Sequence, residues 1–373
     1  MIHDEIGQVL KRWIVATGAA PGASAAIAAF RNGRWHSALG VAGVLTSADP
    51  RPVTPDTIYD LASLTKPMVA ALAARLLARE KASFATPLGA LLGAARGTAS
   101  EVASLGLLTS HRAGLVAHLR LGDGREGPPA DLNPWLVRCA NARRDECRGP
   151  LPEQGYPPLY SDLGYILLGR ALSEASGESL EVLLEREVRG PLGLEVGCAG
   201  ELARRLGAGF AERVAPTEEV AARGGELRGV VHDDNAWELA GRGLAGHAGL
   251  FGTSEGVLAF GTAMLDALVG RSAWLAPARA HELVAPRPGG SLRMGFDGRA
   301  ETGSSVGPRF GARAFGHLGF TGTSLWCDPE ADIVVVLLTN RVSPSRDNIL
   351  IRSVRPSVHD ALFGLAADRR TDG

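Results

Sequence analysis

Strand-like segments stand at both ends of this chain, and the long middle part has the apolar spacing of helices. Because β-α-β alternation is absent, this order predicts an α+β fold. One antiparallel sheet, built from the N- and C-terminal segments and flanked by helices, would carry an inserted all-helical lobe. The segments with strand character are residues 23–31 and 34–41, joined by an Asn32-Gly33 turn, and residues 313–318, 324–328 and 332–340.

We expect one domain over residues 1–373, with residues 1–62 and 285–373 in an α/β lobe and residues 63–284 in a mainly helical lobe. Irregular loops are expected near residues 123–133 and 214–235. Helices are predicted at residues 1–18, 68–79, 161–175, 179–188, 254–269 and 348–363, the last kinked or interrupted at Pro356.

The composition argues against several kinds of partner. A net charge of −1 predicts no nucleic-acid binding, and no segment has the apolar length for membrane insertion. Residues 1–18 are too charged for a signal peptide, so we expect a cytoplasmic protein; an export signal hidden by a mis-assigned start codon is the alternative. No cofactor is expected, and nothing predicts the oligomeric state. The cysteines lack metal-ligand spacing and are expected to be free thiols: Cys139, Cys147, Cys198 and Cys327.

Lysine is nearly absent from this chain, and one of its few lysines follows a serine by three positions. Of 39 Lys and Arg residues, only Lys11, Lys66 and Lys81 are lysines. Arginine stays protonated, whereas a partly buried lysine can lose its proton and act as a base. On a helix the Lys66 amine can reach the Ser63 hydroxyl, which outlines an activated serine nucleophile. Helix capping by Ser63 is the alternative.

A second candidate motif, residues 160–165 (YSDLGY), stands at the entrance of another predicted helix. The Tyr160 phenol could relay a proton if the Lys66 cation lowers its pKa, and Asp162 could hold Lys66 or orient a substrate. Alternatively, Ser161 or Asp162 caps the helix while Tyr160 packs against it.

The third motif, residues 317–323 (HLGFTGT), lies within an apolar edge-strand pattern. Gly319 and Gly322 remove side-chain bulk, so a substrate can lie against the strand. The Phe320 N–H could then form an oxyanion hole with the Ser63 N–H. The alternative is a glycine-rich turn in which His317 is a surface histidine.

Together and in this order, the three motifs resemble those of the serine β-lactamase and penicillin-binding protein superfamily. The resemblance is to its class C β-lactamase-like branch, which also contains carboxylesterases and D-amino-acid peptidases. It extends from about residue 20 to 345 and includes residues 21–24 (PGAS), 57–66 (TIYDLASLTK), 107–115 (LLTSHRAGL), 245–251 (AGHAGLF) and 319–329 (GFTGTSLWCDP).

This resemblance implies that Ser63 is the acylated nucleophile and that Lys66 and Tyr160 form the base that deprotonates it and later activates water. The amides of Ser63 and Phe320, beside Gly319, would form the oxyanion hole. The implied fold is a single β-lactamase-like catalytic domain with its site between the sheet and the helical lobe.

Two positions depart from that family's pattern. Asp162 stands where β-lactamases usually carry Asn, and His317 stands where β-lactamases and DD-peptidases usually carry Lys. A neutral histidine and an added negative charge weaken recognition of a substrate carboxylate, which favours uncharged esters or amides. We therefore expect an esterase that acts on small acyl esters. β-Lactamase or D-amino-acid peptidase (DD-carboxypeptidase) activity is the first alternative, and a non-catalytic sensing or scaffold module is the second.

A rival enzyme class is suggested by residues 252–256 (GTSEG), which fit the G-x-S-x-G nucleophile elbow, with Asp328 or Asp332 and then His359 downstream. The preceding segment is short and glycine-rich, and capping of the next helix by Thr253 or Ser254 explains the pattern adequately.

The remaining histidines have less specific interpretations. His232-Asp233-Asp234 indicates a loop with solvated acids and no metal site, because partner ligands at suitable spacing are missing. His247 either lines the cleft or supports a glycine-rich loop. His111 and Arg112 are expected to brace the cleft.

Overall fold

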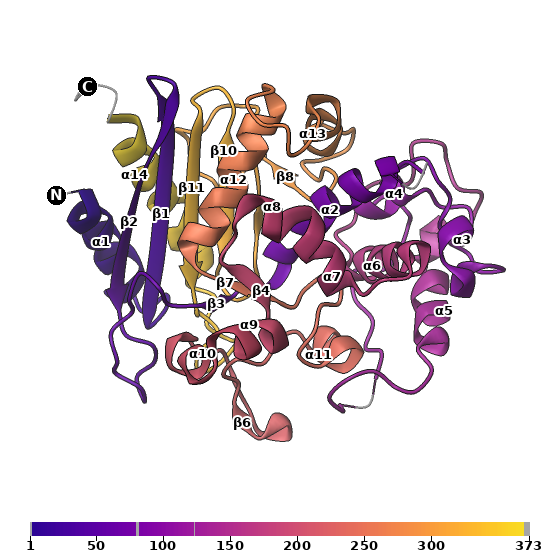
Figure 1. The fold of residues 1–373 in the computed structure, drawn as a ribbon, viewed down its shortest axis with the longest axis horizontal. Coiled ribbons are helices and arrows are strands. Elements are labelled where there is room, and N and C mark those ends of the chain that lie inside the picture. Colours follow the sequence, from indigo (N-terminus) through magenta and orange to yellow (C-terminus); the bar gives the residue numbers. More distant parts are fainter. Residues whose placement is uncertain (1, 80–81, 123, 369–373) are drawn as a thin grey trace.

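The computed structural model describes residues 2–79, 82–122 and 124–368, so Lys81 lies outside the described residues. Both ends of the chain build one six-stranded antiparallel sheet (Figure 1). The predicted α+β fold class is confirmed. The strands, in the order β2-β1-β11-β10-β9-β8, are β2 (Arg34–Gly43), β1 (Gly22–Arg31), β11 (Ile333–Thr339), β10 (Ser324–Asp328), β9 (Phe315–Leu318) and β8 (Asp297–Gly298).

Different helices cover the two faces of this sheet. Ala25 and Ile27 of β1 belong to a core shared with α1 (Ile2–Leu10) and α14 (Ile351–Asp368). The alternate residues Ala26 and Ala28 belong to the core on the other face. Because both faces are covered, every residue of β11 is buried.

Helix α12 (Ser254–Leu268) covers that second face, although the sequence analysis placed it in the helical lobe. It packs on β1, β10 and β11. Gly261 makes this packing close, because a Cβ there would lie 2.6 Å from Val334 Cγ1. The apolar side of α12 is buried against the sheet, which removes it from water.

The last helix, α14, runs unbroken through Pro356, where the sequence predicted a kink or interruption. Pro356 stands in the second turn, so the carbonyl of Arg352 is the helical group that loses its usual donor. Packing of the buried residues Val358 and Leu362 in the sheet core holds the helix together.

The helical part lies beside the sheet and is centred on two buried helices. α2 (Thr65–Arg79) and α6 (Asp162–Ser176) pack against each other, and nearly all of α2 is buried. Around them stand α3 (Leu88–Leu91), α4 (Leu105–Thr109), α5 (Asn133–Asn141), α7 (Leu180–Leu184), α8 (Gly190–Leu192), α9 (Ala199–Leu206), α10 (Ala208–Arg213), α11 (Asp234–Ala240) and α13 (Pro277–Val284).

Two small sheets complete the fold. β3 (Tyr59–Asp60), β7 (Leu250–Gly252) and β4 (Val196–Cys198) pair next to the start of α2. The hairpin of β5 (Glu219–Val220) and β6 (Gly225–Glu226) lies in residues 214–235, which the sequence predicted to be wholly irregular.

All four cysteines are buried free thiols, as predicted. Among the helices of the described residues, none combines the length and the apolar character that a bilayer crossing requires.

Candidate active site

A cavity of about 540 Å³ opens where the residues before α2, the start of α6 and the end of β9 meet. All three sequence motifs reach it: Ser63 from the first, Tyr160 and Asp162 from the second, and residues 317–320 from the third. Lys66 is fully buried and contacts Ser63. The structure therefore brings every predicted site residue together in one place.

Ser63 is presented by a tight turn that precedes α2. Ala62 has a left-handed backbone conformation with φ of 47°, which is unusual for a residue with a side chain. The buried Asp60 carboxylate holds this turn, because it accepts hydrogen bonds from Ala62 N at 2.8 Å and from His232 N at 2.7 Å. The sequence analysis missed Asp60, since no sequence signal marks the left-handed conformation of an alanine.

Lys66 links the first two motifs. Its Nζ donates to Ser63 Oγ at 2.9 Å and to the His247 carbonyl at 3.1 Å, and it lies 2.8 Å from Asp162 Oδ1. The ammonium lies 4.9 Å from the centre of the Tyr160 ring. Lys66 and Ser63 both act to lower the pKa of the Tyr160 hydroxyl, so the phenol lies within their electrostatic reach. Nucleophile, amine and phenol therefore form one connected group.

The charges of this group at rest follow from burial and from Asp162. Burial favours loss of the Lys66 proton, but the Asp162 carboxylate and Tyr160 together outweigh burial and raise the pKa of Lys66. Burial also raises the pKa of Tyr160, although Lys66 acts in the opposite direction. The sequence had considered a lowered pKa for this phenol, and desolvation reverses that sign. At rest Lys66 is an ammonium and Tyr160 is a neutral phenol.

The third motif is fastened directly to the residues before Ser63. Thr321 Oγ1 donates to the Asp60 carbonyl at 2.7 Å, and Thr323 Oγ1 donates to the Leu61 carbonyl at 3.1 Å. These two bonds fix the turn after β9 relative to the nucleophile.

The same turn supplies a backbone donor. A Cβ on Gly319 would lie 2.0 Å from Thr323 Oγ1 and 2.7 Å from the Leu61 carbonyl oxygen, so no side chain fits there. The Phe320 N–H donates to no other group in the described part of the chain. Phe320 and Ser63 line the same cavity.

Two buried histidines, His111 and His317, flank Tyr160 and are neutral. Burial, reinforced by the nearby Lys66 cation, lowers the pKa of each to about 3. His317 Nδ1 donates to the Leu318 carbonyl at 2.8 Å, because a carbonyl oxygen can only accept. The alternative of a surface histidine is wrong for His317, which adds no positive charge to the cavity. His111 Nδ1 accepts from Ser161 N at 3.0 Å and braces the second motif.

The nucleophile-elbow alternative is not supported by geometry. Ser254 Oγ shares a hydrogen bond with Ser24 Oγ at 2.7 Å. His359 Nε2 instead pairs with Ser324 Oγ at 2.8 Å. Serine and histidine of that pattern are therefore engaged with other partners, and no triad is assembled there.

The acidic loop beside the cavity is built from ion pairs. Asp233 caps α11 by accepting from Ala236 N at 2.8 Å and pairs with His247 Nε2 at 2.8 Å. Asp233 is thus engaged in pairing, where the sequence predicted a solvated acid. His247 supports the loop and offers its carbonyl to Lys66. Within the ranges that the structure describes, no cluster of His, Cys, Asp and Glu could hold a metal ion.

Several residues that line the cavity were missed by the sequence analysis. His118 Nδ1 lies 3.6 Å from Asp162 Oδ2, and Asp162 raises the pKa of this imidazole. No sequence signal marks the other residues, because arginine is the ordinary cation of this chain and only the fold gathers them. They are Arg341, Arg346, Arg352 and Arg355.

Comparison with known proteins agrees with this geometry. A sequence model of the Beta-lactamase family matches residues 10–357. Over 209 residues the chain is 31% identical to "N-acetylmuramyl-L-alanine amidase" of Bacillus subtilis (strain 168), covering 52% of this chain and 46% of that protein. Over 333 residues it is 27% identical to "Putative D-alanyl-D-alanine carboxypeptidase" of Escherichia coli O157:H7, covering 82% and 74%. The chain thus spans about half the length of the first of these relatives.

Solved structures show the same fold at low sequence identity. "EstCE1, a hydrolase with promiscuous acyltransferase activity" superposes with a TM-score of 0.69 and 20% identity over 96% of this chain and 98% of that chain. The D-amino acid amidase from Ochrobactrum anthropi SV3 superposes with a TM-score of 0.69 and 19% identity over 99% of each chain. Because the family match extends over nearly the whole sequence, the chain belongs to the beta-lactamase family.

Proposed function

We propose that this protein is a serine hydrolase that works through an acyl-enzyme at Ser63. The observation that carries the proposal is the hydrogen bond from Lys66 Nζ to Ser63 Oγ, with the centre of the Tyr160 ring 4.9 Å from the same Nζ. A nucleophile within reach of its base, with that base held by a third group, is the arrangement that covalent catalysis requires. Asp162 is the third group here.

Acylation would begin with attack of Ser63 Oγ on the carbonyl carbon of an ester or amide, while the hydroxyl proton passes to the Lys66–Tyr160 pair. The amides of Ser63 and Phe320 would bind the oxyanion. Collapse of the tetrahedral intermediate breaks the bond to the alcohol or amine, which leaves with that proton. Water then attacks the acyl carbon and gives a proton to the same pair. When the bond between the acyl carbon and Ser63 Oγ breaks, the pair returns that proton to Oγ, which releases the acid and free Ser63.

Lys66 has to lose its resting proton before it can accept one from Ser63. Asp162 Oδ1 is the carboxylate oxygen within reach at 2.8 Å, and His118 stands beside the other oxygen of Asp162. The active form is therefore the form in which the Lys66–Asp162–Tyr160 group holds one proton fewer.

Small acyl esters are the substrate class that we propose first. The neutral His317 leaves the third motif without the cation that would bind a carboxylate there. Hydrolysis of amides, including D-amino-acid amides and β-lactams, is the second candidate. It is favoured by the relatives and the solved structure that carry amidase and carboxypeptidase names.

Labelling with a fluorophosphonate and with a fluorescent penicillin tests the proposal. We expect a covalent adduct on Ser63 in the parent protein and none in Ser63→Ala, located by mass spectrometry of the digested protein. A panel of short nitrophenyl esters, nitrocefin and D-Ala peptides would then rank the substrate classes. Absence of an adduct with both reagents would favour a non-catalytic sensing or scaffold module.

A further inference from the structure

Asp162 stands between two bases that come from different parts of the chain. Its Oδ1 lies 2.8 Å from Lys66 Nζ, and its Oδ2 lies 3.6 Å from Nδ1 of His118, in the loop that joins α4 to α5. His118 lines the same cavity as Ser63. One carboxylate carries one negative charge, so it cannot fully compensate two cations at once. The protonation states of Lys66 and His118 are therefore coupled through Asp162.

The two bases differ in their access to water. The Lys66 side chain is 0% exposed, whereas 53% of the His118 side chain is exposed. Among the groups that raise the pKa of Lys66, the Asp162 carboxylate has the largest effect. Asp162 is therefore the main group that holds the proton on the buried amine, and His118 is the base through which the pH of the solution reaches Asp162.

His118 has acids around it on the side of α6 and α11. Asp162 is the main cause of a raised pKa at His118, and Asp233 and Asp234 act in the same direction, while partial burial opposes them. Both of the latter acids also have basic partners of their own. The ordinary pKa of histidine is about 6.5, so the His118 imidazole changes its charge at a pH where Lys66 is still an ammonium.

We propose that His118 competes with Lys66 for Asp162 and thereby sets the pH at which Lys66 becomes a base. His118 is then a positioning residue, because it acts on the reaction through Asp162. The inference rests on the proposed function and adds the regulation of that site by pH. A protonated His118 shares the carboxylate charge, so the proton on Lys66 is held less tightly. When His118 is neutral, the carboxylate charge acts on Lys66 alone.

The competition also provides an acceptor for the resting proton of Lys66. The N–H bond that breaks at Lys66 Nζ is replaced by an N–H bond at His118 Nδ1, and Asp162 is ionised both before and after the exchange. The total charge of the three groups therefore stays the same. The neutral amine can then accept the proton of the Ser63 hydroxyl, and no proton has to be released to the solution before acylation.

Two substitutions of His118 with opposite effects on charge test the proposal by kinetics on a neutral ester, 4-nitrophenyl butyrate. His118→Arg supplies a permanent cation, so the rising limb of the pH profile of kcat/KM should move about 1 pH unit toward acid. His118→Ala removes the competing base, so the limb should move about 0.5 pH unit toward alkali. His281, exposed on α13, is the control, and His281→Arg and His281→Ala should leave the profile in place.

A histidine titration followed by NMR tests the same coupling without turnover. The imidazole signal of His118 is assigned among the nine histidines by its loss in His118→Gln. In Lys66→Met the carboxylate has lost its other cation, so the pKa of His118 should rise by about 1 unit. In Asp162→Asn the anion itself is lost, and the pKa of His118 should fall by a similar amount. The two variants are independent, so either one alone decides the result if the other does not fold.

An unchanged pKa of His118 in Lys66→Met or in Asp162→Asn would overturn the proposal. A pH profile that moves in the same direction in His118→Arg and His118→Ala would overturn it as well. Failure of the proposed hydrolase function is distinguishable from both results. It would show itself as absence of a label on Ser63, whereas the histidine titration is measured without any reaction.

Discussion

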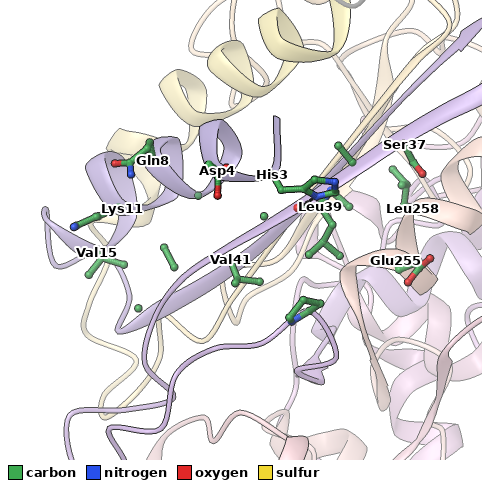
Figure 2. Close-up of a pocket in the computed structure, with 17 residues that line it drawn as sticks. His3, Asp4, Gln8, Lys11, Val15, Ser37, Leu39, Val41, Glu255 and Leu258 are labelled. Carbon is green, nitrogen blue, oxygen red and sulfur yellow. Dashed lines mark hydrogen bonds between the residues drawn. The ribbon is translucent and has the colours of Figure 1, made fainter. Parts of the chain in front are cut away.

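Two hollows in this protein differ in what they can do. The larger, about 900 Å³, lies where α1 passes the outer strand β2 (Figure 2). It also has a serine and a lysine, but Ser37 and Lys11 are exposed and stand at opposite ends of it. In the smaller hollow, about 540 Å³, Ser63 lies 2.9 Å from the fully buried Lys66.

The difference teaches that neither volume nor residue type marks a reactive site here. What distinguishes the smaller hollow is that its serine is hydrogen-bonded to a lysine whose side chain is fully buried. Electrostatic interactions are stronger there than at the surface, so each neighbour of Lys66 affects its proton. At Lys11 the solvent would screen such effects.

Replacing the two serines gives the sharpest contrast. Ser63→Ala should reduce kcat/KM for a nitrophenyl ester by at least about a thousandfold, since it removes the attacking atom. Ser37→Ala should stay near the parent value. Steady-state kinetics of both purified variants measures this, and comparable losses in the two would break the distinction between the hollows.

The two lysines offer the next comparison. Lys66→Arg should lower kcat by about a hundredfold to ten-thousandfold, because a guanidinium cannot accept the proton of Ser63. Lys11→Arg keeps an exposed cation and should have no effect. If Lys66→Arg retained more than a few per cent of the activity, Lys66 would not be part of the base.

The substitution Asp162→Asn tests, through the pH dependence of activity, whether the neighbours of Lys66 control its proton. Asp162 raises the pKa of Lys66, and the reaction needs Lys66 without its proton, so activity on a neutral ester should rise toward alkaline pH. Removing the carboxylate lowers the pKa of Lys66, and the rising limb of the pH–rate profile should move about 1–3 pH units toward acid. A limb that stays in place would mean that another group controls the rate.

The smallest effect on activity is expected at the larger hollow. Gly40 lies against α1, and a Cβ there would come within 2.6 Å of Ile6 Cβ. Gly40→Val should therefore lower Tm by about 2–4 °C through overpacking while kcat/KM stays near the parent value. Gly209→Ala, with open space around the new Cβ, is the matched control for Tm. A large loss of activity at unchanged Tm would show that the larger hollow takes part in the reaction.

The sheet and the three motifs could be predicted because their signals are local. Asn32-Gly33 fixes a hairpin by its turn preference, and the spacing of Ser63 and Lys66 fixes their shared face. The position of α12 could not be predicted. Its apolar sequence shows that the helix must be buried, but the sequence does not show which surface of the protein buries it.

Asp60 and the arginines that line the active-site cavity were beyond prediction for a related reason. Arg355 is one arginine among many, and its burial depends on contacts between distant segments. Asp60 acts through the left-handed backbone of Ala62, and alanine carries no preference for that conformation. The charge states of Lys66 and Tyr160 depend in the same way on three-dimensional neighbours.

The place of β11 in the middle of the sheet has a consequence for the protein during its synthesis. This strand pairs with β1 on one side and β10 on the other, so the first strands made wait for one of the last. A ribosome that has finished Ser63, Lys66 and Tyr160 has made these three groups, but it has not yet made the third motif, residues 317–323. Until β10 and β11 leave the exit tunnel, the apolar side of α12 has only β1 and β2 of the main sheet to pack on, and the growing chain at that stage is the form most in need of a chaperone.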